Sequence, residues 1–273
     1  QVVGAVRDAE RLSVDPETKS QLEIIEIDFL EDKQVELPKD IDIAYYLIHS
    51  MSSSTKNFDE LEAKAAKRFV KLVEQTSIKQ VIYLSGIVNQ EELSKHLKSR
   101  KQVEHILRQG HYSLTVLRAG IIVGSGSASF EILRDLCEKL PFMITPKWVN
   151  TKCQPIAIRD VIYYLTNVIN KEECFNQSFD IPGPDTLSYK EMMKTYAEVR
   201  ELPLTIVNVP VMTPKLSSYW LFFVTATSYK LAQNLVDSMK VDVTTTDRRL
   251  ETMLKHNPIS YKRCFKTSSE TFL

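Results

Sequence analysis

The stretch 79–124 limits the fold of this 273-residue chain more than any other. It begins with a short apolar run at 80–85 that stops at Gly86, which is the pattern of a buried strand ending at a turn. Helical spacing follows over 93–109, and a second buried strand is predicted at 113–118. Such a strand–helix–strand unit implies two parallel strands joined by a right-handed crossover. The sequence therefore predicts an α/β protein with a parallel sheet.

The predicted helix at 93–109 has an apolar face whose N-terminal end is polar. His96 and Arg100 open this face, one turn apart, just beyond the carboxyl end of the preceding strand. Ligands bind at that edge of open α/β sheets, so we expect the two side chains to point into a cleft. The complete face consists of His96, Ser99, Arg100, Val103, Ile106 and Leu107.

Three segments of this unit resemble the second half of extended short-chain dehydrogenase/reductases. They are IYLSG at 82–86, HLKSR at 96–100 and TVLRAGIIVG at 115–124. Members of this family have a Ser or Thr at the end of the first strand, a Tyr-x-x-x-Lys motif on the helix and a Leu-Arg-Pro segment after the next strand. The resemblance extends over nearly the whole chain, and its motifs specify fold better than reaction.

The chain departs from the family pattern at each catalytic position. His96 replaces the Tyr and Arg100 replaces the Lys. Gly86 stands where the catalytic Ser is expected, with Ser85 one residue earlier, and Ala119 replaces the Pro. The sequence is therefore similar to an atypical branch, the NmrA-like proteins and the NAD(P)H-binding proteins described as epimerase-like.

The resemblance implies a Rossmann-type doubly wound parallel sheet with a small mixed C-terminal lobe. We predict a dinucleotide-binding core at 1–172 and a substrate or partner lobe at 173–273. A Rossmann core needs a glycine-rich turn after its first strand, but the chain has only seven glycines and none forms GxxGxxG. We expect the first strand, this turn and the first helix to precede Gln1 in a longer parent protein, with that strand central in a 3-2-1-4-5 sheet.

The strand predicted at the start of the chain ends in two arginines that favour NADP. In Rossmann units the tip of this strand meets the adenosine ribose, and an Arg there accommodates a 2′-phosphate. Arg7 lies at the tip and Arg11 follows one turn later, while Asp8 leaves NAD open. The alternative is a solvated basic pair.

Further cofactor contacts follow from the resemblance. Asp28 and Phe29, after the next strand, are expected against the adenine, although Asp28 could equally open a turn. The end of a strand at 42–50 is expected to face the cofactor, and a structural role for its histidine is equally open. The full set of expected contacts is Arg7, Arg11, Asp28, Phe29, Ile48, His49, Ser50, Ser85, Gly86, Arg100, Ala119, Gly120, Ile121 and Ile122.

Two polar residues of the central unit are candidates for catalysis, His96 and Ser85. An imidazole can donate or accept a proton near neutral pH, so His96 is the candidate acid or base. Arg100 can hold the ribose but cannot readily give up a proton. One hypothesis is an NAD(P)-dependent oxidoreductase or sugar-epimerase-like enzyme acting on an unknown small molecule. The alternative is a non-catalytic NADP(H)-binding sensor or assembly module of NmrA-like type, favoured by the lost catalytic residues.

Other helices are read from periodicity. The helix at 58–75 is predicted to turn Leu61, Ala65, Phe69, Leu72 and Val73 inward. Asp160 is interpreted as an acidic residue at a helix start. Ser188, followed by Glu191, predicts a capping box. The apolar run at 219–224 is interpreted as a buried helix of the lobe, and it is the sole support for a third hypothesis, a structural subunit.

Composition argues against a nucleic-acid-binding, disulfide-rich or membrane-spanning protein. The net charge is zero, which gives no support to nucleic-acid binding. Four scattered cysteines without a CxxC motif indicate reduced thiols of a cytoplasmic protein, and we expect no metal site. No apolar run approaches the roughly 18–20 residues that span a bilayer. We expect a monomer or homodimer that binds a dinucleotide and a small-molecule substrate.

Overall fold

The computed structural model describes residues 1–49, 58–88, 95–145, 147–208 and 241–266. The run at 219–224 and Ser50 therefore lie outside the described residues. Six further side chains are also outside this description, although their backbones belong to helices or strands: those of Lys95, His96, Lys147, Trp148, Asn208 and Lys266.

A parallel four-stranded sheet forms the centre of the molecule. Its order is β10-β5-β4-β3, and every neighbouring pair runs parallel. The two strands predicted in the central unit are β4 and β5, paired along their whole length from Gln80–Ser113 to Gly86–Ala119. The strands are β3 (Ile43–Tyr46), β4 (Gln80–Gly86), β5 (Ser113–Ala119) and β10 (Ser178–Asp180). This confirms the α/β Rossmann-type fold.

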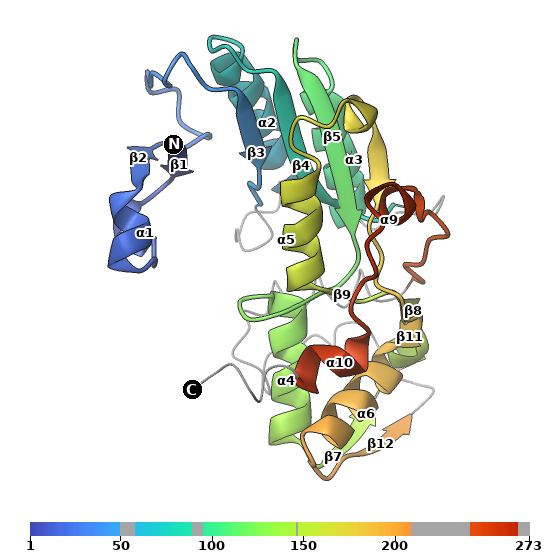
Figure 1. Cartoon of the computed structure of the whole chain (residues 1–273). Helices are drawn as coiled ribbons and strands as arrows, with labels where there is room; N and C mark the ends of the chain where they lie inside the picture. Colours follow the sequence, from blue (N-terminus) through green and yellow to red (C-terminus); the bar gives the residue numbers. More distant parts are fainter. Residues whose placement is uncertain (50–57, 89–94, 146, 209–240, 267–273) are drawn as a thin grey trace.

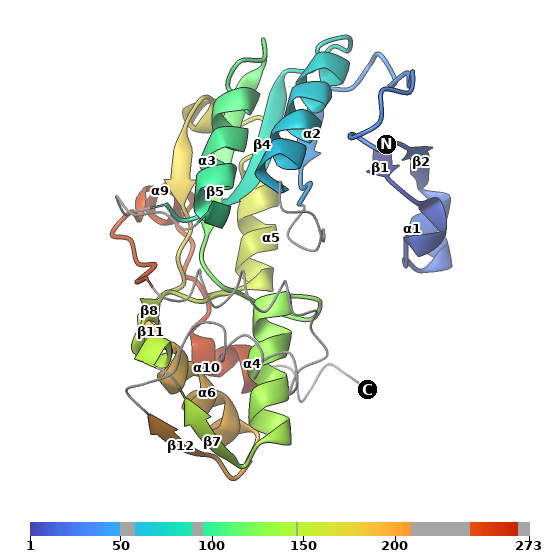
Figure 2. The ribbon, with the colours of Figure 1, turned by 180° about the vertical axis from the view of Figure 1, so that it is seen from behind.

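Helices cover both faces of this sheet. The helices α2 (Phe58–Val73) and α3 (Lys95–Leu107) lie side by side on one face (Figure 2). The helix α5 (Ile158–Asn167) crosses the other face (Figure 1). This layering explains why β4 and β5 read as continuous apolar runs, since strands covered on both sides bury residues of both orientations.

A second, two-stranded parallel sheet begins the chain. Its strands β1 (Val2–Val6) and β2 (Leu22–Glu26) are joined through the short helices η1 (Ala9–Arg11) and α1 (Pro16–Ser20). Figure 1 shows this unit beside β3. Among the described residues β1 pairs only with β2, and β3 only with β4. The described strands of these two sheets do not pair with each other, so the 3-2-1-4-5 order stays a prediction.

The predicted faces of α2 and α3 are confirmed in most positions. On α3 the side chains of Ser99, Arg100, Val103, Ile106 and Leu107 are all buried. On α2 the residues Ala65, Phe69 and Val73 are buried, whereas Leu61 and Leu72 are only half-buried. The inward stripe of α2 instead includes Phe58 and Glu62.

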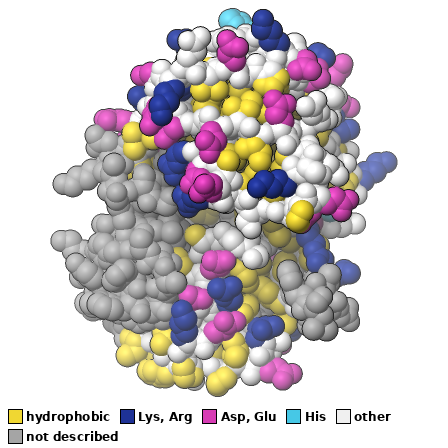
Figure 3. Space-filling view, turned by 90° about the vertical axis from the view of Figure 1, so that its left-hand side faces the viewer, with side chains coloured by type: hydrophobic (Ala, Val, Ile, Leu, Met, Phe, Trp, Pro, Cys, Tyr) yellow, Lys and Arg dark blue, Asp and Glu magenta, His cyan; other side chains and the backbone are white. Residues whose placement is uncertain are grey.

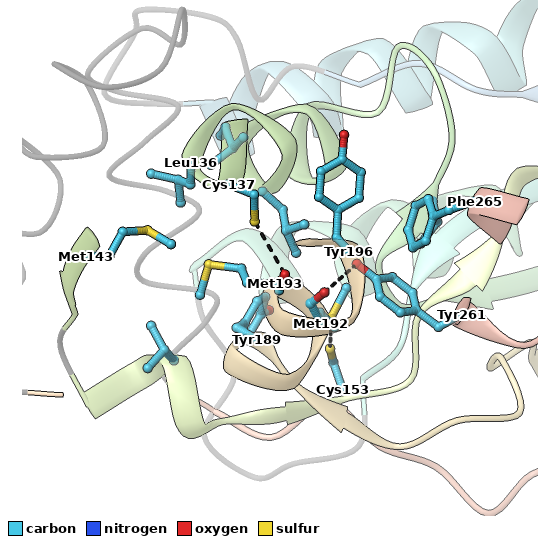
Figure 4. Packing of buried hydrophobic residues seen from close by; sticks show 14 residues of the cluster. Leu136, Cys137, Met143, Cys153, Tyr189, Met192, Met193, Tyr196, Tyr261 and Phe265 are labelled. Atoms are coloured by element: carbon cyan, nitrogen blue, oxygen red, sulfur yellow. Dashed lines mark hydrogen bonds between the residues drawn. The ribbon is translucent and has the colours of Figure 1, made fainter. Parts of the chain in front are cut away.

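The lobe has its own hydrophobic core, in which aromatic rings and thioethers pack against α6 (Tyr189–Val199) (Figure 4). Its capping box is confirmed, because Ser188 Oγ accepts from Glu191 N–H at 3.2 Å and Glu191 Oε2 accepts from Ser188 N–H at 2.7 Å. The other lobe elements are α4 (Ala128–Lys139), β7 (Phe142–Thr145), η2 (Lys147–Asn150), β8 (Lys152–Cys153), β11 (Leu187–Ser188), β12 (Thr205–Asn208) and α10 (Tyr261–Lys266).

Residues on both sides of position 172 contribute to the sheet and to the lobe. β10 follows this position yet pairs with β5, and α4 precedes it yet packs into the lobe core. The domain boundary at 172 therefore stays a prediction. The short strands β6 (Ile122–Val123) and β9 (Ile156–Ala157) pair with each other, and α9 (Arg249–Leu254) packs on the sheet side. The short helix η3 (Glu172–Cys174) precedes β10.

One carboxylate ties α3 to two strands of the sheet. Glu104 accepts hydrogen bonds from Arg108 Nη2 at 2.9 Å, from Arg118 Nη2 at 2.9 Å and from Ser178 Oγ at 3.0 Å. Burial raises the pKa of Glu104, but the hydrogen bonds from these three residues outweigh it and hold the pKa below its ordinary value.

We expect Glu104→Gln to lower the free energy of unfolding at neutral pH by about 1–3 kcal/mol, because the charge-assisted bonds are lost. A carboxyl whose pKa is depressed on folding stabilises the protein above its unfolded pKa, and this contribution is lost as the pH falls through the folded pKa. The difference between variant and wild type should therefore shrink in acid. Urea unfolding across the acid range measures it, with the exposed Glu172→Gln as control. An unchanged difference in acid would contradict the ionic origin.

Candidate functional site

A cluster of polar side chains lies between the sheet and the helices α2 and α3, at the carboxyl ends of β3 and β4. Its members come from four elements and are far apart in the sequence. We call it the polar cluster, and it consists of Tyr46, His49, Glu62, Tyr83, Ser85, Ser99 and Arg100.

The carboxylate of Glu62 is the most deeply buried charge of the polar cluster. Its side chain is 2% exposed. Ser99 Oγ donates to Glu62 Oε2 at 2.5 Å, and Nδ1 of His49 lies 3.3 Å from Glu62 Oε1. The side chain of His49 is 38% exposed, so one ring contacts the buried carboxylate and also reaches the surface of the site.

The guanidinium of Arg100 lies deeper in the site than the sequence suggests. Only 8% of the residue is exposed, and Nη1 donates to the hydroxyl of Tyr83 at 3.4 Å. Burial raises the pKa of Tyr83, while the charge of Arg100 and a hydrogen bond with Ser85 oppose the rise. Both phenols, Tyr83 and the neighbouring Tyr46, are therefore neutral at physiological pH, and Arg100 supplies positive charge beneath the site.

The structure brings together His49, Ser85 and Arg100 of the predicted site residues, with Ile48 and Gly86 adjacent in the chain. A Cβ at Gly86 would lie 3.2 Å from Cδ2 of Leu97, so α3 passes close to the end of β4. His96 occupies the second position of α3, but its side chain is outside the described residues. Its catalytic role stays a prediction.

The predicted contacts that run from Ala119, the last residue of β5, to Ile122 lead from the sheet into the lobe. The side chain of Ala119 is buried, and its carbonyl accepts from the N–H of Ile87 at 3.0 Å. A Cβ at Gly120 would lie 3.0 Å from the carbonyl oxygen of Gln154, so the backbones approach closely there. Ile121 packs on the lobe core, and Ile122 lies in β6, paired with β9.

At the other end of the expected cofactor site, Arg7 and Arg11 are both exposed near the carboxyl end of β1. Asp28 accepts from the N–H of Leu30 at 2.8 Å, which is the turn that the alternative interpretation expects. The ring of Phe29 lies 6.1 Å from that of Phe69 and packs on the sheet core.

Sequence reasoning did not assign four residues of the polar cluster to the site: Tyr46, Glu62, Tyr83 and Ser99, of which Ser99 was placed only on the helix face. Glu62 lies in line with Phe58 and Phe69 on the buried stripe of α2, so an acidic residue at an apolar position was the available signal. Tyr83 is inside the predicted strand, where a buried phenol gives no distinguishing pattern.

No model of a known protein family matches the chain, and no curated protein matches its sequence. Solved structures do match. Triphenylmethane reductase from Citrobacter sp., complexed with NADP(H), has a TM-score of 0.74 at 14% identity, over 97% of this chain and 90% of that chain. The chain has the fold of this protein. The match confirms the α/β Rossmann-type fold that the sequence resemblance implied.

Two further structures share this fold. The NADPH-dependent quinone oxidoreductase from Escherichia coli, complexed with NADPH, has a TM-score of 0.73 at 13% identity, over 98% of this chain and 90% of that chain. A nucleoside-diphosphate-sugar epimerase from Staphylococcus aureus has a TM-score of 0.70 at 12% identity, over 97% of this chain and 90% of that chain.

The donor set of the site fits a nicotinamide dinucleotide. Such a cofactor carries anionic phosphates and ribose hydroxyls, which pair with cations, hydroxyls and imidazoles. Arg7 and Arg11 supply exposed cations at one end, and the polar cluster supplies Ser85 and His49 at the other. Tyr46 adds a buried hydroxyl without a hydrogen-bond partner among the described residues.

Within the described part of the chain, no group of three or more His, Cys, Asp or Glu side chains could hold a metal ion. No helix found there is long and apolar enough to cross a membrane.

Proposed function

We propose that the chain binds a nicotinamide dinucleotide, NADP in preference to NAD, and acts as an oxidoreductase or epimerase-like enzyme on a small molecule. The observation that carries the proposal is the polar cluster, with a half-exposed imidazole at the carboxyl ends of two parallel strands. In open α/β sheets ligands bind at this edge. The names of the structures that share the fold, reductases and an epimerase, favour an enzyme over a sensor.

Each part of the chain has a separate task in this proposal. Arg7 and Arg11 hold the 2′-phosphate, and Arg100 stabilises the negative charge of the bound cofactor from beneath. The nicotinamide, when bound, supplies or accepts a hydride. His96 and the hydroxyl of Ser85 lie on the elements that border the nicotinamide end, and we assign them to proton transfer and substrate orientation.

The cysteines support a reducing, cytoplasmic location. None of the four forms a disulfide, and three of them, Cys137, Cys153 and Cys174, are buried. Burial raises the pKa of Cys137 and of Cys153 to about 12, so these thiols are unreactive core residues. On the face seen in Figure 3, acidic and basic side chains are interspersed over the described part, so nucleic acid is not among the partners that we propose.

Calorimetric titration of the full-length protein with NADPH and NADH tests the proposal. We expect NADPH to bind more tightly, and Arg7→Ala to weaken NADPH binding by about tenfold or more while leaving NADH binding nearly unchanged, since a charge-assisted bond contributes about 1.5–3 kcal/mol. Lys19→Ala, on the neighbouring α1, is the control for a general loss of positive charge. Binding of neither cofactor would overturn the proposal, and equal loss for both cofactors would overturn the NADP preference.

A further inference from the structure

The two carboxylate oxygens of Glu62 have different partners. One carboxylate oxygen accepts from Ser99 on α3, and the other faces His49 at the end of β3. The carboxylate itself comes from α2. Three separate elements thus converge on one buried anion, and the ring of His49 is the only one of the three side chains that reaches the surface of the site, at 38% exposed.

A buried carboxylate is costly unless it is paired and hydrogen-bonded. Glu62 occupies a position on α2 where the flanking residues of the stripe, Phe58, Ala66 and Phe69, are apolar and buried. An apolar residue there would satisfy packing at lower cost. The carboxylate therefore has a role that packing alone does not explain.

We propose that Glu62, held by Ser99, positions the imidazole of His49 and makes its Nε2 atom a proton-transferring group of this site. The inference rests on the proposed function for the reaction served, but the positioning itself does not depend on it. A carboxylate beside Nδ1 holds a proton on that nitrogen, which leaves Nε2 as the atom that exchanges a proton.

With a reduced dinucleotide bound, a carbonyl substrate would accept a hydride from it at the carbonyl carbon, and the carbonyl oxygen would take the Nε2 proton of a His49 imidazolium. The ring would be left neutral, with Nδ1–H still donating to Glu62. In the oxidative direction neutral His49 would accept the hydroxyl proton at Nε2, and the hydride would pass from the carbon to the oxidised dinucleotide.

Charged groups from two helices act on His49. Burial lowers the pKa of His49 and the Arg100 charge on α3 lowers it further, whereas the hydrogen bond to Glu62 on α2 raises it. The phenols of Tyr46 on β3 and Tyr83 on β4 are neutral, because burial raises the pKa of each. The net effect lowers the pKa of His49, and the hydrogen bond to Glu62 opposes this lowering.

Nuclear magnetic resonance of the imidazole nitrogens tests the positioning without any ligand. We expect neutral His49 to carry its proton on Nδ1. In Glu62→Gln the pKa of His49 should shift to lower pH, and Ser99→Ala should cause a smaller shift in the same direction. Glu60→Gln, an exposed neighbour on the same helix, is the matched control. His49→Gln assigns the signal.

Two results would overturn the positioning. One is a proton on Nε2 in the wild-type protein, and the other is an identical His49 titration in wild type and both variants. The position of the proton on the His49 ring is measured in the wild-type protein, so this part of the test does not depend on the folding of Glu62→Gln.

Modification by diethyl pyrocarbonate, which attacks unprotonated imidazole nitrogen, tests the second half of the inference. We expect His49 to be modified at Nε2 and NADPH to slow the modification several-fold, whereas the exposed His111 should react at the same rate with or without NADPH. Unaltered modification of His49 in a protein that binds NADPH would overturn the role of His49 in the reaction. Absence of NADPH binding would overturn the proposed function as well, while leaving the tautomer result to stand for the positioning.

Discussion

Replacing Gly183 with alanine is expected to remove most of the stability of the protein. A Cβ on this residue would lie 1.7 Å from the carbonyl oxygen of Pro155 and 2.7 Å from its carbonyl carbon. Both atoms belong to buried backbone next to β9, so no flexible side chain can move aside. Overpacking a core with one methyl group costs about 1–3 kcal/mol, and a backbone clash costs more, against a total stability of about 5–15 kcal/mol.

Thermal melting and urea unfolding measure this effect. The matched control is Gly4→Ala, where the nearest atom to the added Cβ is the carbonyl oxygen of Glu23 at 3.9 Å, an ordinary contact. We expect the control to unfold close to the wild type and Gly183→Ala to unfold at a much lower temperature. Wild-type melting of Gly183→Ala would mean that this segment does not pack against Pro155.

Asp160→Ala is expected to destabilise the protein by about 3 kcal/mol, because a buried anion with two partners is removed. Asp160 is 1% exposed. Its Oδ2 accepts from the N–H of Ile259 at 2.8 Å, and Nε2 of His256 lies 2.8 Å from Oδ1. The residue does lie in the first turn of α5, as the sequence indicates. In addition, Asp160 holds the segment between α9 and α10 in place through His256 and Ile259.

The anchor is checked by comparing three variants in urea unfolding. His256→Ala should lose less than Asp160→Ala, because it removes the stacking of the imidazole on Tyr163 (ring centroids 3.9 Å apart) but leaves the Ile259 N–H paired. The exposed Arg159→Ala, next to Asp160, should change stability little. Equal stability of Asp160→Ala and the control would refute the anchor.

The central unit was predictable because its signals are local. Alternation of apolar runs, a glycine and a helical stripe fixes β4, α3 and β5, and the buried face of α3 is found from spacing alone. The start of the chain was predictable to the level of strands, since β1 ends directly before Arg7 and β2 ends two residues before Asp28.

The polar cluster was less predictable because its contacts are not local. Glu62 and Ser99 lie 37 residues apart, and the hydrogen bond between them exists only once α2 and α3 pack together. In a sequence an acidic residue on a helix usually indicates a solvent-exposed face. The charge of Glu62 therefore argued against its position on the buried stripe of α2. Arg100 was predicted at the site, but its depth beneath Tyr83 follows from the packing of α3 on β4.

The pairing of β10 with β5 has a consequence for how the chain is made. β5 is an interior strand of the finished sheet, yet its partner β10 is synthesised only after α4, β7 and α5. At the usual pace of translation this interval is a few seconds. During that time β5 can pair with β4 on one edge, while the backbone N–H and C=O groups of its other edge have no partner strand. The backbone groups on this edge of β5 are therefore paired only when residues 178–180 dock.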